Sequence, residues 1–204
     1  LNYVEGAKTL SADFYSEVAL DDRREFNKVH RLSGTLVGVA KNSVNGNAGE
    51  LQSSLPFRNL GVSGRVSYVY DNRYAAEFNF GYNGSERFSL AHRYGFFPSI
   101  GVAYTPSEEK YWEGLKNVLT KFKLRATYGF VGNDDIGSPS DRFFYLSNVN
   151  MNSGTRGMTF GALKNYNLSG IDITRYANND ITWEKSAKTN FGLDATLFGK
   201  LNIN

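Results

Sequence analysis

The chain has 204 residues, which suits one ordinary domain or a piece of a larger one, and 41% of them are hydrophobic while 21% are charged. These proportions exclude the composition of a disordered chain, and the absence of cysteine excludes disulfides, thiolate metal sites and cysteine nucleophiles. The net charge is +3, and the charge run at 21–25 is mixed in sign, so no basic patch predicts nucleic-acid binding.

Strand-like sequence recurs along the whole chain. The predicted strands are 7–20, 29–41, 60–70, 74–84, 93–105, 121–132 and 183–198, with a further one beginning near 201. Asp71-Asn72-Arg73 predicts a tight hairpin turn, because Asp and Asn tolerate the left-handed backbone that such turns need. Gly199-Lys200 predicts another turn. The connections 42–59, 85–92 and 133–182 are long and rich in Gly and Asn.

One connection has helical character. Residues 107–119 predict a short helix, capped by Ser107 and favoured by acidic residues in its first turn. Its expected buried stripe consists of Tyr111, Leu115, Val118 and Leu119. In the longest connection, the apolar run 143–146 predicts a short strand.

Polarity alternates with period two along the predicted strands, so one face of each strand is apolar and the other is polar. The apolar face includes Val62, Val66, Phe78, Phe80, Ile100, Val102, Leu124 and Leu193. The polar face includes Arg65, Glu77, Asn79, Lys123, Arg125 and Asp194. The sequence therefore predicts an all-β protein with antiparallel strands.

Two architectures produce this alternation: a soluble β-sandwich, for instance a carbohydrate-binding module, and a transmembrane β-barrel. Three features favour the barrel. The runs exceed the usual globular strand of about 5–6 residues, tyrosines cluster near the ends of the apolar faces, and the polar face mixes charges with small residues, as a wet lumen would. The apolar set is then lipid-facing and the polar set lumen-facing.

A barrel also predicts an orientation, because bacterial barrels place short turns in the periplasm. With the turn at 71–73 on that side, connections 20–28, 105–121 and 199–200 are periplasmic, including the predicted helix. Connections 42–59, 85–92 and 133–182 are then exterior. The longest connections all fall on one side, as this architecture requires.

No group of residues predicts a catalytic, cofactor or metal site. His30 and His92 are isolated, and no nucleophile–base arrangement accompanies them. Asn133-Asp134-Asp135 with Asp141 is rich in oxygen ligands, but it lacks the spacing of a calcium loop, so a solvated turn is the favoured interpretation.

Several ordered strings resemble the SusC-like TonB-dependent transporters of Bacteroidota outer membranes. The dense part of the resemblance begins with LPFRNLGVSGR at 55–65 and YVYDNRY at 68–74. It continues with EFNFGYNGSERF at 77–88, RYGFFPS at 93–99 and KLRATYG at 123–129, while TWE at 182–184 and KTN at 188–190 extend it more loosely.

This resemblance implies more than the alternation does. It implies that residues 1–204 are an internal part of one barrel domain, about seven strands of a 22-stranded parent, without the plug domain and the C-terminal strands. It also implies a multi-pass outer-membrane importer of large nutrients, such as oligosaccharides or peptides. The implied partners are a SusD-like surface lipoprotein, outer-membrane lipid, and the TonB-ExbB-ExbD complex through regions outside the chain. A passive porin is the alternative within the membrane.

Overall fold

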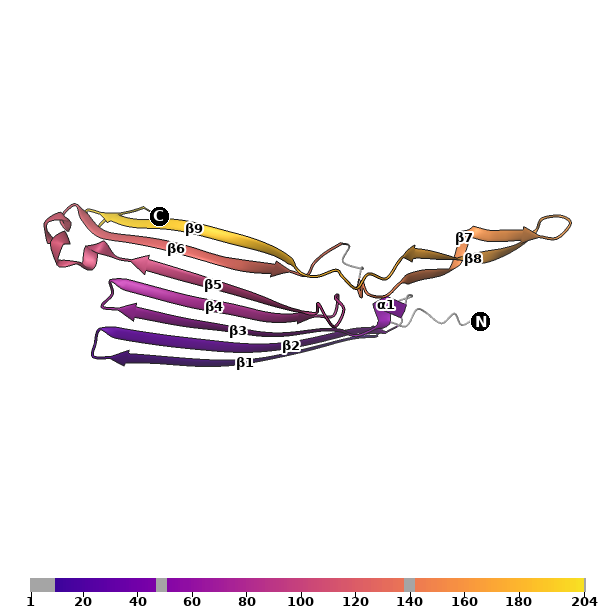
Figure 1. Ribbon diagram of the computed structural model, residues 1–204, viewed down its shortest axis with the longest axis horizontal. Helices are drawn as coiled ribbons and strands as arrows, with labels where there is room; N and C mark the ends of the chain where they lie inside the picture. The colour runs from indigo at the N-terminus through magenta and orange to yellow at the C-terminus, as the bar shows by residue number, and fades with distance from the viewer. Residues whose placement is uncertain (1–9, 47–50, 138–141, 204) are drawn as a thin grey trace, which may run out of the picture.

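The computed structural model describes residues 10–46, 51–137 and 142–203. Its main strands are β1 (Leu10–Phe26), β2 (His30–Gly46), β3 (Phe57–Tyr70), β4 (Tyr74–Ser85), β5 (Tyr94–Tyr104), β6 (Leu119–Asn133), β9 (Glu184–Leu197) and β10 (Leu201–Ile203). They form one 8-stranded antiparallel sheet in the order β1-β2-β3-β4-β5-β6-β9-β10. The sheet is a long single layer (Figure 1). The seven long strands that the alternation predicted and the one beginning near 201 are all present, although residues 7–9 of the first lie outside the described residues.

Tight turns join the strands at one end of the sheet. Asp71 and Asn72 both have positive φ, 48° and 57°, which is the backbone of the type I′ turn that matches strand twist. The predicted hairpin at 71–73 is therefore confirmed. The turn between β9 and β10 places Gly199 at φ 65°, and Lys200 N–H closes it on the carbonyl oxygen of Leu197 at 3.0 Å.

The first connection was predicted too long. Residues 20–26 continue β1, and only the turn between Phe26 and His30 separates it from β2. All five residues at 21–25 are charged, so polar and apolar residues do not alternate there, and nothing in this stretch of sequence indicated a strand. Pairing of its backbone with β2 along the whole length of β1 decides the conformation.

The predicted helix at 107–119 is wrong in type. The chain forms two 3-10 helices, η1 (Pro106–Glu108) and η2 (Lys110–Leu115), and β6 already begins at Leu119. Ser107 lies inside η1, buried, and its hydroxyl donates to the carbonyl oxygen of Phe122 instead of capping a helix. The predicted buried stripe is also wrong, since Tyr111, Leu115 and Val118 are exposed.

The long connection after β6 contains a hairpin that the sequence did not predict. Strands β7 (Asn148–Phe160) and β8 (Tyr166–Arg175) form a separate 2-stranded sheet, which projects beyond the end of the main sheet (Figure 1). The predicted strand at 143–146 is a turn in which Phe143 has φ 51°. The short helix α1 (Leu51–Ser54) lies near the base of this hairpin. Within the described residues, no helix has the length and apolarity needed to cross a membrane.

Candidate functional site

The register of the main sheet fixes which side chains share a face, because directly opposed residues of antiparallel strands point the same way. Val66 lies opposite Gly34 on one side and Phe78 on the other, and Phe78 lies opposite Ile100. Val62, Phe80, Val102, Leu124 and Leu193 follow by the same period of two. The residues predicted for the apolar face thus occupy one face of the sheet.

This apolar face is exposed. Val66 is 50% exposed and Ile100 53%, whereas Phe80 is half-buried over Gly64. The described part of the chain supplies no second sheet to cover it, since β7 and β8 pair only with each other. A soluble sandwich buries such a face, and exposed apolar surface of this extent is rare on soluble monomers. The face therefore requires apolar surroundings.

Aromatic rings mark both ends of the apolar face. Near the tight turns, the rings of Tyr74 and Tyr104 stack with centroids 5.1 Å apart, and Tyr70 continues the row. Toward the opposite end, Tyr82 and Tyr94 stack at 5.2 Å. Two aromatic bands flanking an apolar zone are the pattern of a barrel wall between two membrane interfaces.

The other face carries charged groups that bind one another. Arg65 Nε donates to Asn79 Oδ1 at 2.9 Å and lies 3.5 Å from Glu77 Oε1. Asn79 Nδ2 donates to the same carboxylate at 2.8 Å, so the three side chains form one cluster across β3 and β4. These pairs are partly exposed, so each contributes only about 0–1 kcal/mol to stability.

A second polar cluster joins β6 and β9. The guanidinium of Arg125 lies 3.0 Å from Asp194 Oδ1, and Lys123 is opposite Asp194 in the register. Gly192 permits this arrangement, since a Cβ there would lie 2.5 Å from Arg125 Nε. All six residues predicted for the polar face do share that face, in two clusters.

Strand β1 adds polar residues that the sequence analysis missed, because 20–28 was predicted as a connection, and β2 adds Thr35. Thr35 donates to Asp21 at 2.6 Å across the polar face. Asp22 and Arg24 fall on the apolar face instead, where they pair with each other at 2.9 Å. Extending the alternation of β2 back through the charge run would have placed Asp21 on the polar face and Asp22 and Arg24 on the apolar face.

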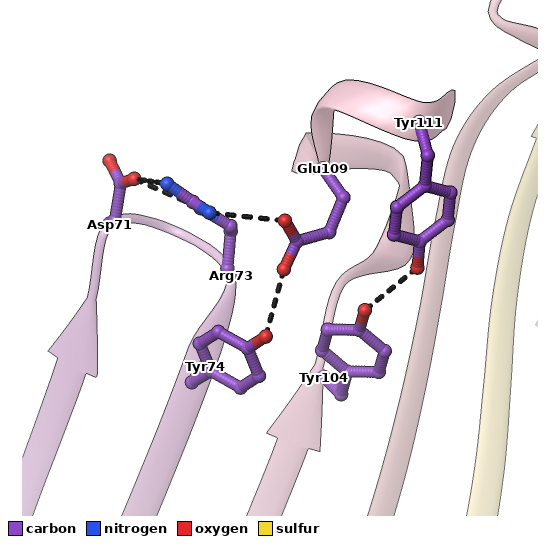
Figure 2. A network of polar contacts seen from close by, with 6 residues as sticks. All are labelled: Asp71, Arg73, Tyr74, Tyr104, Glu109 and Tyr111. Atoms are coloured by element: carbon purple, nitrogen blue, oxygen red, sulfur yellow. Dashed lines mark hydrogen bonds and ion pairs between the residues drawn. The ribbon is translucent and has the colours of Figure 1, made fainter. Parts of the chain in front are cut away.

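A network of polar contacts links the 71–73 turn to the connection between β5 and β6 (Figure 2). Arg73 binds Asp71 and also donates to Glu109 Oε2 at 3.0 Å, and Tyr74 donates to Glu109 Oε1 at 2.8 Å. The hydrogen bond with Asp71 is the main cause that raises the pKa of Arg73 above its usual value. The network holds the connection against the end of the wall.

The hydroxyls of Tyr104 and Tyr111 lie 2.8 Å apart beside this network (Figure 2). This hydrogen bond is the largest cause that raises the pKa of Tyr111 to about 12, with desolvation second. Tyr111 is therefore neutral at any physiological pH.

At the opposite end of the sheet, loops pack around a small aromatic core. Trp183 is 8% exposed, and its ring contacts those of Phe88 and Phe97 with centroids 5.5 and 5.2 Å away. Trp183 Nε1 donates to the carbonyl oxygen of Arg93 at 3.1 Å. This core joins Trp183 to the β4–β5 connection and to β5, which lie far from it in sequence, so spacing along the chain carried no signal for it.

The acidic loop after β6 forms protein contacts. Asp135 lies 3.0 Å from Arg87, and Asn133 donates to Glu184 at 3.0 Å. Asp141 lies outside the described residues. Among those that are described, no three metal-ligating side chains gather.

Curated proteins similar to this chain are TonB-dependent receptors. TonB-dependent receptor SusC of Bacteroides thetaiotaomicron is 36% identical over 153 residues, covering 74% of this chain and 14% of that protein. TonB-dependent receptor P3 of Formosa agariphila is 32% identical over 139 residues, covering 68% of the chain and 13% of that protein. The chain thus spans only about a seventh of the length of these relatives. No family model matches it.

Solved structures share the fold. The RagAB peptide importer in its closed-closed state superposes with a TM-score of 0.69 over 93% of this chain and 22% of that one, at 20% identity. The open-open state of the same importer gives 0.62 at 22% identity. The open antiparallel sheet, its two aromatic bands and these relatives agree, and the chain belongs to the SusC-like TonB-dependent receptors of the bacterial outer membrane, as a segment of their transmembrane β-barrel wall.

Proposed function

We propose that this chain is part of the wall of an energised outer-membrane importer of large nutrients. The observation that carries the proposal is the single-layer sheet with an exposed apolar face and a polar face of ion pairs. It is supported by the receptors and importers that the chain resembles. Those relatives are not enzymes, and we propose no catalytic role.

The two faces take different surroundings in this proposal. The apolar face, with Val66 at its centre, contacts lipid. The polar face, with the Arg65 and Arg125 clusters, contacts the water-filled lumen or the plug. Ion pairs between neighbouring strands join Arg65 to Glu77 and Arg125 to Asp194 without a ligand, so we assign these four residues to the wall and not to a substrate site.

The partners follow from the family. A SusD-like lipoprotein closes the exterior mouth, and the TonB-ExbB-ExbD complex supplies energy through regions outside this chain. The cargo is an oligosaccharide or a peptide. The similarity to SusC supports the assignment to a SusC-like transporter, on which the lipoprotein partner depends, and the peptide importer among the structural matches supports peptide as one class of cargo.

Uptake measurements test the proposed function in the full-length protein. Cells that depend on this receptor are expected to take up its oligosaccharide or peptide, and deletion of TonB should abolish that uptake while leaving the barrel in the membrane. Uptake that persists without TonB would identify a passive porin instead.

Orientation makes a separate prediction. An epitope inserted at 161–165, the tip of the β7–β8 hairpin, should be detected by antibody on intact cells. The tip is preferred to 153–156 of the same connection, because those residues belong to β7 and an insertion there would interrupt the strand. An epitope at 113–116 should stay hidden until the outer membrane is permeabilised. Labelling of 113–116 on sealed cells would reverse the assignment.

A further inference from the structure

The connection Pro106–Val118, here called the rim segment, folds over one particular side of the wall. Tyr74 donates to its Glu109, and Tyr104 is hydrogen-bonded to its Tyr111 (Figure 2). Both tyrosines belong to the apolar face, because they lie opposite one another in the row that includes Tyr70 and Leu124.

A third contact also joins the rim segment to the apolar face. Trp112 stacks on Phe122 with centroids 5.5 Å apart and planes at 10°, and its Nε1 donates to the carbonyl oxygen of Leu119 at 3.1 Å. Phe122 lies two residues before Leu124 and therefore also points from the apolar face. The rim segment thus sits on the outer side of the wall and not over the lumen.

Large apolar side chains remain exposed on this segment. Tyr111 is 67% exposed, Leu115 51% and Val118 51%. Since β5 pairs directly with β6, no further strand can enter between them to cover the segment. Its exposed apolar surface is continuous with the apolar face of the wall.

The composition of the rim segment matches a membrane interface. It combines Tyr111 and Trp112 with Lys110 and Lys116, whose long side chains can lie on apolar surface while their ammonium groups reach phosphates. Of its three glutamates, Glu109 is bound by Arg73 and Tyr74, whereas Glu108 and Glu113 are exposed. A groove of about 630 Å³ beside Tyr74 and Tyr104, which includes Val102, offers space for an acyl chain.

We propose that the rim segment is an interfacial anchor, inserted at the boundary between headgroups and acyl chains in the periplasmic leaflet of the outer membrane. The proposal rests on the proposed function, since it requires the apolar face to contact lipid. Arg73 and Glu109 hold the segment down at its start, and the anchor fixes the height of the barrel in the bilayer.

Depth-dependent quenching tests the anchor. In a full-length receptor carrying no other cysteine, Leu115→Cys is labelled with an environment-sensitive fluorophore and reconstituted in phosphatidylethanolamine–phosphatidylglycerol nanodiscs. Brominated lipid is expected to quench most of the emission, and aqueous iodide little of it. Lys200→Cys, in the β9–β10 turn at the same end of the wall, is the matched control and should respond in the opposite way.

Val66→Cys separates failure of the anchor from failure of the wall. If iodide reaches the Leu115 probe as well as the Lys200 probe while bromine quenches Val66, the anchor is wrong and the wall stands. If neither quencher reaches Leu115, a protein covers the segment, and the lipid anchor is again overturned. If Val66 escapes brominated lipid, the proposed function itself fails. Heat-modifiable mobility of every labelled variant confirms that each barrel is folded.

Discussion

Val66→Arg in the full-length receptor is expected to impair assembly of the barrel. Val66 lies on the apolar face, midway between the tyrosine rows that contain Tyr70 and Tyr82. A cation facing lipid near the midplane costs about 2–4 kcal/mol in a barrel. The heat-modifiable folded fraction in isolated outer membranes measures the effect. Phe80→Arg and Leu193→Arg are expected to act in the same direction.

Matched changes on the polar face provide the control. Arg65 precedes Val66 in the sequence but lies on the polar face, and Asn79 on β4 and Thr196 on β9 lie on the same face. The control variants are therefore Arg65→Ala, Asn79→Ala and Thr196→Ala. All three should leave the folded fraction unchanged, because exposed ion pairs contribute little. Nearer the interfaces the cost of a cation falls to about 0–1 kcal/mol, so Tyr70→Arg and Tyr82→Arg should be tolerated better. Equal damage from Arg65→Ala and Val66→Arg would contradict the assignment of faces.

Trp183→Ala is expected to release the loops at the exterior end while the barrel remains folded. Removing a buried tryptophan costs about 3–5 kcal/mol, and here its partners Phe88 and Phe97 would lose their packing. Phe97 belongs to β5, but Phe88 and Trp183 lie in the loops at this end, outside the paired strands, so the loss should be local. Protease cleavage within 133–182 on intact cells should accelerate, with heat-modifiable mobility unchanged.

Two variants delimit this effect. Trp183→Phe keeps most of the ring and loses the hydrogen bond to Arg93, a smaller cost of about 0.5–1.5 kcal/mol. Tyr176→Ala changes a 74% exposed side chain and should leave cleavage as it is. Cleavage that is equally fast in the Tyr176 and Trp183 variants would show that the aromatic core does not order these loops.

The strands with regular alternation were predictable because successive side chains of a strand point to opposite faces, so apolar and polar residues alternate along the sequence. The period of two along β3 to β6 and β9 located the strands and sorted Val66 from Arg65 before any pairing was known. The Asp71-Asn72 turn was equally local, since its backbone conformation depends on the residues within it. The ordered strings shared with SusC-like receptors then identified the family.

Elements whose conformation depends on distant partners were not predictable in this way. The charge run at 21–25 became strand through its pairing with β2, and the β7–β8 hairpin has irregular register and exposed apolar residues on both faces, so its alternation is weak.

The sequence by itself determined that the chain forms long two-faced strands joined by tight turns at one end, because those features arise from neighbouring residues. Only the tertiary structure decided which side chains meet across strands and loops. It brought Arg73 to Glu109 and Tyr104 to Tyr111, and it gathered Trp183 with Phe88 and Phe97. It also turned the rim segment toward the apolar side of the wall. Hydrogen bonds and ring contacts between different elements of the structure set these arrangements, and no local period encodes them.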